Sequence, residues 1–185
     1  MKRALFSFVV LVILTGLPGF LSIPQTVSYE RDEEVLSLKE ALGQTLLIGF
    51  EGKVMSPELE TLVKKMQPGG VLLLGRNIEN AQQVKILIAK LQEISRVPLF
   101  VAIDQEGGIV SRVWWEEATA QALLQDETHA LKIGELRAQG LVKIGANMNL
   151  APVLDGNSSE DYLFTRSFQV NSLLSSLFAA SLIEG

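Results

Sequence analysis

The sequence predicts an α/β fold in which helices cover a parallel sheet. Short, continuously apolar segments alternate with longer segments whose apolar residues recur at helical spacing, a pattern typical of parallel strands joined by helices. The predicted strands begin near residues 46, 71, 99 and 147. The first two intervals match one strand-helix unit each, and the third contains an additional long connection.

In chain order, the first expected helix covers residues 37–47, and residues 46–50 form a short buried strand. Ser56 is suited to cap a helix over 57–66, because its hydroxyl can accept a hydrogen bond from a free amide of the first turn. A Pro-Gly-Gly sequence ends that helix, and the continuously apolar residues 71–74 form the second strand.

The second half of the chain continues the alternation. Asn80 is suited to cap a helix over 81–95, and the third strand, at 99–103, runs into a polar turn at 104–108. The elements expected after this turn are a mostly helical segment at 119–139, a fourth strand at 147–154 and a fourth helix at 172–183.

Two architectures fit these units, an open doubly wound sheet and a (β/α)8 barrel. No Gly-x-Gly-x-x-Gly sequence follows the first strand, which disfavours a dinucleotide-binding sheet. A complete barrel needs about 250 residues. Residues 38–185 supply about four βα units, so a barrel of this length would stop near halfway and leave two open sheet edges.

The N-terminus is distinct from this domain. Lys2 and Arg3 precede an apolar run of about 20 residues, which is roughly enough to span a bilayer. Residues 1–23 are therefore predicted to be a signal peptide or a membrane anchor rather than a core helix, and residues 24–37 a linker. The two basic residues favour export of residues 38–185, either secreted or held at the membrane.

Composition excludes several classes of function. The net charge of −5 among 185 residues argues against a nucleic-acid partner. The chain has no cysteine, which excludes a thiolate nucleophile and Cys-ligated metal centres, and its single histidine, His129, disfavours a multi-histidine metal site. No cofactor or metal is expected.

Polar residues at strand ends are the candidates for function, because active sites of parallel α/β folds form there. Asp104 directly follows the third strand, Gly107 and Gly108 allow a tight turn, and Arg112 can return its guanidinium to the same place. The alternative is a turn whose acids, Asp104 and Glu106, only cap nearby amides. Their separation of two residues on one turn disfavours them as a pair of catalytic carboxylates that act from opposite sides of one bond.

Two later segments belong to the same edge of the predicted sheet. Asp155 ends the fourth strand, where bracing a loop and contributing to a site are equally compatible with the pattern. Arg166 lies in the loop after that strand, and is therefore expected near the same carboxyl-terminal edge of the sheet as Asp104 and Arg112.

The ordered combination of five motifs resembles the N-terminal barrel domain of glycoside hydrolase family 3, and within it the β-N-acetylhexosaminidase branch. The matching motifs are Pro68-Gly69-Gly70-Val71, Ile103-Asp104-Gln105-Glu106-Gly107-Gly108-x-Val110-x-Arg112, Gly134-Glu135-Leu136-x-Ala138-x-Gly140, Asn149-Leu150-Ala151-Pro152-Val153-Leu154-Asp155 and Arg166-Ser167-Phe168. The resemblance favours the barrel over the doubly wound sheet.

The resemblance implies a glycan substrate that contains N-acetylglucosamine, such as peptidoglycan fragments, and retaining hydrolysis. Asp104, Arg112 and Arg166 would hold the sugar. The residues that shape the site would be Glu106, Gly107, Gly108 and Asp155.

The reacting groups of this branch are not expected within the chain. The family supplies its acid/base pair from a Lys-His-Phe-Pro-Gly-His-Gly segment after the fourth helix and its nucleophilic aspartate later still. Both are expected after Gly185, so these 185 residues are predicted to be inactive alone. The alternative is a noncatalytic sugar-binding or structural remnant at the cell surface.

Overall fold

A computed structural model describes residues 36–155, 158–160 and 162–185 of the chain. The predicted N-terminal segment, 1–23, lies outside the described residues, as does the linker 24–37 apart from Leu36 and Ser37. Ser37 caps the first helix, α1 (Leu38–Gly43). None of the helices in the part of the chain that the structure describes is long and apolar enough to span a membrane.

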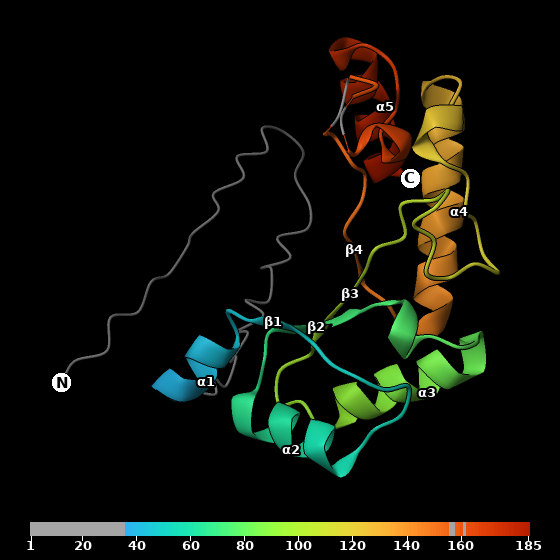
Figure 1. Cartoon of the computed structure of the whole chain (residues 1–185). Helices are drawn as coiled ribbons and strands as arrows, with labels where there is room; N and C mark the ends of the chain where they lie inside the picture. The colour runs from blue at the N-terminus through green and yellow to red at the C-terminus, as the bar shows by residue number, and fades with distance from the viewer. Residues whose placement is uncertain (1–35, 156–157, 161) are drawn as a thin grey trace, which may run out of the picture. The chain divides into compact units, whose positions relative to one another are not determined.

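The sheet has four parallel strands in the order of the sequence: β1 (Leu47–Gly49), β2 (Gly70–Leu73), β3 (Phe100–Ile103) and β4 (Met148–Asn149) (Figure 1). A doubly wound sheet reverses its strand order at a switch point, and this sheet does not. Sequential order is that of a (β/α)8 barrel. The sheet is open, and within the described residues β1 and β4 are its edges.

Helices cover one face of the sheet. They are α2 (Pro57–Met66), α3 (Ala81–Glu93) and the C-terminal part of α4 (Glu127–Ile144). The residues buried between sheet and helices are Leu59, Val63, Val71, Leu73, Val84, Leu87, Ile88, Leu91, Val101, Ile103, Leu141 and Ile144. The start of α4 instead packs against α5 (Ser172–Glu184), around Phe168 and Phe178 (Figure 1).

The opposite face of the sheet carries apolar side chains that are not fully buried. The strand register places Leu47 beside Gly70 and Phe100, and Leu72 in the same row as Met148, on this second face. The side chains of Leu47 and Phe100 lie close to Gly70. A Cβ added at position 70 would lie 2.6 Å from a Leu47 methyl carbon and 2.9 Å from the Phe100 Cβ. Leu47 and Phe100 are both exposed.

The predicted helix over 119–139 is displaced toward the C-terminus: α4 begins at Glu127 and ends at Ile144, so the two overlap only over 127–139. The Asp126 carboxylate accepts a hydrogen bond of 2.7 Å from the His129 amide and so caps the helix at this point. The residues before Asp126 form only a 3₁₀ turn, η2 (Gln121–Leu123), because the side-chain amide of Gln121 is hydrogen-bonded to the backbone of Val153.

The predicted fourth strand over 147–154 was too long, since β4 comprises only Met148 and Asn149. Pro152 has no N–H to give to a strand ladder, and the Val153 amide donates to the Gln121 side chain over 2.8 Å. The predicted Ser56 and Asn80 caps are confirmed. There are two further 3₁₀ turns: η1 (Gly75–Asn77) follows β2, and η3 (Phe164–Arg166) precedes α5.

Candidate functional site

The first feature of the site is an ion pair at the carboxyl end of β3. Arg112 Nη2 lies 3.4 Å from Asp104 Oδ2, and the side chains are 29% and 22% exposed, so both remain partly accessible. The Arg112 Nε is buried without a hydrogen-bond partner among the described residues. A buried donor without a partner is costly, and a ligand oxygen would remove that cost.

A second ion pair links the same turn to the loop before α5. Arg166 donates from Nε over 2.8 Å and from Nη2 over 2.5 Å to the two oxygens of Glu106, whose side chain is 4% exposed. The hydrogen bond to Glu106 raises the pKa of Arg166, and the charges of Glu106, Tyr162 and Asp104 act in the same direction, against desolvation. Arg166 is therefore cationic and lies within electrostatic reach of Asp104.

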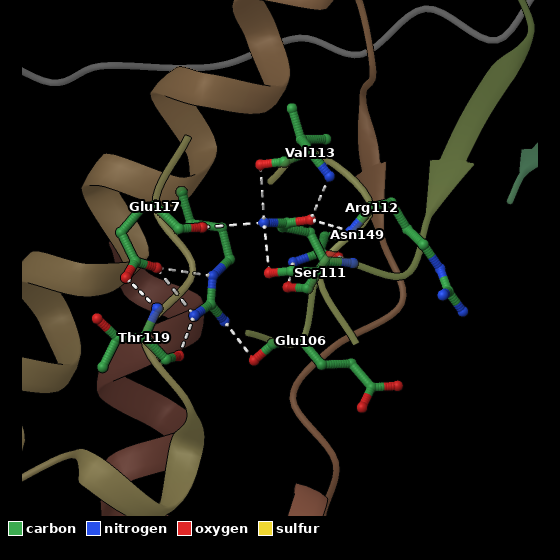
Figure 2. Close-up of polar contacts among 9 residues, drawn as sticks. Glu106, Ser111, Arg112, Val113, Glu117, Thr119 and Asn149 are labelled. Carbon is green, nitrogen blue, oxygen red and sulfur yellow. Dashed lines mark hydrogen bonds and ion pairs between the residues drawn. The ribbon is translucent and has the colours of Figure 1, made fainter. Parts of the chain in front are cut away.

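The buried Gln105 side chain holds the loop that carries Arg112. Its Oε1 accepts from the amides of Arg112 and Val113 over 2.8 and 2.9 Å, and its Nε2 donates to the Glu117 carbonyl over 2.9 Å. The same Nε2 donates to the Ser111 hydroxyl over 3.2 Å (Figure 2). One side chain thus satisfies loop groups that would otherwise be buried unpaired.

Arg137 anchors the other end of this loop to α4. Its Nε and Nη2 lie 3.2 and 3.0 Å from Glu117 Oε2, in a pair whose side chains are 3% and 10% exposed. The guanidinium also donates to the Glu106 carbonyl over 3.1 Å and to the Thr119 carbonyl over 2.9 Å (Figure 2). Arg137 therefore fixes the backbone of the residue that positions Arg166.

Two asparagines of the β4 region bind the backbone of β3 through their side chains. Asn147 accepts from the Val101 amide over 2.7 Å and donates to the Leu99 carbonyl over 3.0 Å. Asn149 accepts from the Gln105 amide over 3.0 Å and donates to its carbonyl over 3.1 Å. These amides take the place of strand hydrogen bonds where β4 is short, and they fix the turn after β3.

The structure brings most of the predicted site residues together. Asp104, Glu106, Arg112 and Arg166 form two adjacent ion pairs at one edge of the sheet. Asp155 is exposed and makes no hydrogen bond to the described residues.

Gly107 and Gly108 form the predicted turn, with φ of 86° and 60°. Alanine at position 107 would place its Cβ 2.0 Å from the Thr119 carbonyl oxygen and 2.8 Å from Arg137 Nη2. We expect Gly107→Ala to destabilise the domain by more than the cost of about 1–2 kcal/mol for a left-handed residue. Urea unfolding measures this. The control is Gly52→Ala, which has a φ of 98° but no atom within 4 Å of its Cβ; equal losses in the two variants would contradict the clash.

The roles of Gln105, Glu117 and Arg137 were not predicted from the sequence. Arg137 occupies one of the variable positions of the Gly134–Gly140 motif, and Gln105 lies within the Asp104–Gly108 motif. Neither residue had a sequence signal of its own that indicated a structural role. No three His, Asp or Glu side chains gather as a cation site within the described ranges.

Consecutive parallel βα units with charged side chains at the carboxyl ends of the strands are the arrangement of (β/α)8-barrel enzymes. Residues 37–185 match the family described as "Glycosyl hydrolase family 3 N terminal domain". The chain belongs to glycoside hydrolase family 3, and the predicted resemblance to this family is confirmed.

Relatives of known name are β-hexosaminidases. The chain is 32% identical to β-hexosaminidase A of Pseudoalteromonas piscicida, over 74% of this chain and 28% of that protein. Among solved structures, a family 3 β-N-acetylglucosaminidase from Paenibacillus sp. str. FPU-7 is 29% identical with a TM-score of 0.73, over 80% of this chain and 30% of that one. NagZ of Neisseria gonorrhoeae in complex with N-trifluoroacetyl-D-glucosamine is 26% identical with a TM-score of 0.68, over 75% of this chain and 45% of that one. The chain spans less than half of each of these relatives.

Proposed function

We propose that this domain binds an N-acetylhexosamine unit of a glycan and forms the sugar-binding part of a retaining β-N-acetylhexosaminidase. The observation that carries the proposal is the Asp104–Arg112 pair at the end of β3, in which the Arg112 Nε has no hydrogen-bond partner among the residues that the structure describes. The names of the relatives, β-hexosaminidase and β-N-acetylglucosaminidase, supply the sugar class.

The charged groups suit sugar hydroxyls, each of which donates and accepts hydrogen bonds. Asp104 is an acceptor, and Arg112 is a rigid donor whose Nε is available. Glu106 accepts hydrogen bonds from the Nε and Nη2 groups of Arg166, so in this proposal the Nη1 group of Arg166 donates to the ligand. Because hydrogen bonds with one charged partner are strong, these three side chains can orient a pyranose ring.

Residues 36–185 bind and orient the sugar in this proposal. Retaining hydrolysis also needs a nucleophile, which forms a glycosyl-enzyme, and an acid/base group that acts in both steps. Asp104 and Glu106 do not serve as this pair, since each is held by an arginine and they leave the same turn. The two reacting groups come from other residues of the complete active site.

Binding of N-acetylglucosamine to the full chain, followed by calorimetry, tests the proposal. Losing a charged hydrogen bond costs about 1.5–3 kcal/mol, so Asp104→Ala and Arg112→Ala should weaken binding by about 10- to 100-fold. Glu93→Ala, which removes an exposed carboxylate at the end of α3, should leave it unchanged. Unchanged binding in both site variants would refute the assignment.

We further infer that the domain acts outside the cytoplasm, on the basis of Lys2, Arg3 and the apolar run that follows. A fusion of residues 1–37 to a reporter that is active only after export tests this. An inactive reporter, in cells where a known signal sequence activates it, would contradict export.

A further inference from the structure

Another pair of an acid and an arginine lies where β1 and β2 end. Arg76 follows β2 in the turn η1, and its Nε lies 2.8 Å from Oε1 of Glu51, which comes two residues after the end of β1. The same Nε donates to the Phe50 carbonyl over 3.2 Å. The sugar site described above uses residues that follow β3 and β4, so this pair has no role in it.

The strand register places Glu51 and Asp104 at the same level of the sheet. Gly49, Leu72 and Ala102 are neighbours in one row across β1, β2 and β3. Glu51 and Asp104 each come two residues after a member of this row, and residues two apart in an extended chain face the same side. The two carboxylates therefore belong to one row at the carboxyl ends of the strands.

Arg76 extends over the face of the sheet that is opposite the helices. Gly49 shares this face with Leu47, and a Cβ added to Gly49 would lie 3.7 Å from Arg76 Nη2. Since β2 lies between β1 and β3 (Figure 1), and neighbouring strands are about 4.8 Å apart, Glu51 and Asp104 are roughly 10 Å apart. A disaccharide spans this separation, whereas a single pyranose ring does not.

The buried Asn77 holds the backbone on which Arg76 is carried. Its Nδ2 donates to the carbonyls of Phe50 and Gly52 over 3.0 and 2.8 Å, and its Oδ1 accepts from the Leu74 amide over 3.0 Å. Arg76 is 43% exposed, and its Nη1 and Nη2 donate no hydrogen bond to the described residues. The loops are thus fixed by Asn77, and the terminal nitrogens of Arg76 are available to a ligand.

The charges at this end of the sheet are balanced. Each arginine described at the strand ends already has a carboxylate partner, in the pairs Arg76–Glu51, Arg112–Asp104 and Arg166–Glu106. A ligand carboxylate beside Arg76 would lie close to the like charge of Glu51, which is unfavourable. Hydroxyl groups both donate and accept, so they suit a pair that offers one donor and one acceptor.

We propose that Arg76 and Glu51 form a second sugar subsite, which binds an uncharged unit linked to the N-acetylhexosamine and disfavours a unit that carries a carboxylate. Arg76 donates to hydroxyl or acetamido oxygens of this unit, and Glu51 accepts from its hydroxyls. The second subsite rests on the proposed function, which places the first unit at Asp104 and Arg112. Its own contacts join β1, β2 and the loops that follow them, so they do not depend on the segments that complete the active site.

Calorimetry of the full chain with two uncharged ligands tests the second subsite. N-acetylglucosamine reaches the first subsite only, and its β-1,4-linked disaccharide reaches both, so the disaccharide should bind about 10-fold more tightly. Arg76→Ala should remove this gain and leave monosaccharide binding unchanged. Lys53→Ala is the matched control, because it removes the cation of an exposed pair with Glu79 between the same two loops, and it should change neither affinity.

A ligand with a charged second unit tests the specificity. The disaccharide of N-acetylglucosamine and N-acetylmuramic acid carries a carboxylate on its second unit and should bind more weakly than the uncharged disaccharide. Glu51→Gln should raise its affinity by about 5-fold and change that of the uncharged disaccharide by less than about 2-fold. Glu79→Gln removes the same charge from the neighbouring pair and should leave both affinities unchanged.

Equal affinities for the monosaccharide and the uncharged disaccharide would overturn the second subsite. Equal losses for both ligands in Arg76→Ala would overturn it as well, since they would indicate a structural role for Arg76. Tighter binding of the charged disaccharide than of the uncharged one, or no gain in Glu51→Gln, would overturn the specificity. Monosaccharide binding without a gain for the disaccharide refutes the second subsite alone, whereas no binding of either sugar refutes the proposed function too.

Discussion

Replacing Arg137 by alanine is expected to lower the free energy of unfolding by about 3–5 kcal/mol, because it leaves the buried Glu117 carboxylate without its counter-charge. The Arg137 side chain is 3% exposed and that of Glu117 10%, so water cannot replace the lost hydrogen bonds without opening the loop. The carbonyls of Glu106 and Thr119 also lose a donor. For a domain of this size such a loss is a large part of the total stability.

Urea denaturation of the full chain measures the effect of Arg137→Ala. Lys132→Ala, which breaks an exposed pair with Glu135 on the same helix, should cost less than about 1 kcal/mol. The double variant Arg137→Met, Glu117→Leu should recover much of the loss, because replacing both charges leaves none buried alone. A loss of the same size in Lys132→Ala and Arg137→Ala would show that burial of the pair is unimportant.

Replacing Gln105 by alanine should cost at least about 2 kcal/mol and loosen the loop in the native state. The amides of Arg112 and Val113 would lose their acceptor, at about 1–3 kcal/mol for each buried unpaired group. The Glu117 carbonyl would lose a donor at the same time. Arg112 would then be positioned only by its contact with Asp104.

The two tryptophans report on this loop. Trp114 and Trp115 are the only tryptophans of the chain, and their rings meet edge to face with centroids 5.3 Å apart. Acrylamide quenching of their fluorescence should therefore rise in Gln105→Ala before any urea is added. Gln125→Ala, at an exposed position before α4, should change stability by less than about 0.5 kcal/mol and leave quenching unaltered. Unaltered quenching in Gln105→Ala would contradict its role in the loop.

Periodicity and turn residues predicted the positions of the helices and strands best where local signals agree. Ser56 and Asn80 each cap a helix whose apolar stripe begins just after it, and both helices form as predicted. The start of α4 was wrong by about two turns because Ala-rich residues 118–124 have helical propensity but are held by tertiary hydrogen bonds, such as that of Gln121 to Val153. Such long-range contacts override local preference.

The sequence predicted which residues at the strand ends form the candidate site. It did not predict the buried side chains that hold those residues in place. Asp104 and Arg112 were placed together because both follow one strand, and the structure pairs them. Glu106 was expected only to shape a turn, whereas it also binds Arg166. Asp126 caps α4, a role that was not predicted because the helix was expected to begin at residue 119. Gln105 and Arg137 act through burial, which depends on the folded chain and leaves no periodic signal.

The pairing of Glu106 with Arg166 also has a consequence for biosynthesis, because the two residues are 60 positions apart. A ribosome that adds about 5–20 residues per second delivers the guanidinium about 3–12 s after the carboxylate. During this interval β1, β2 and β3 can assemble with α2 and α3, while the Glu106 carboxylate must stay hydrated. Translation therefore separates the assembly of the first three strands from the completion of the site at the end of β3, which waits for the segment that contains Arg166.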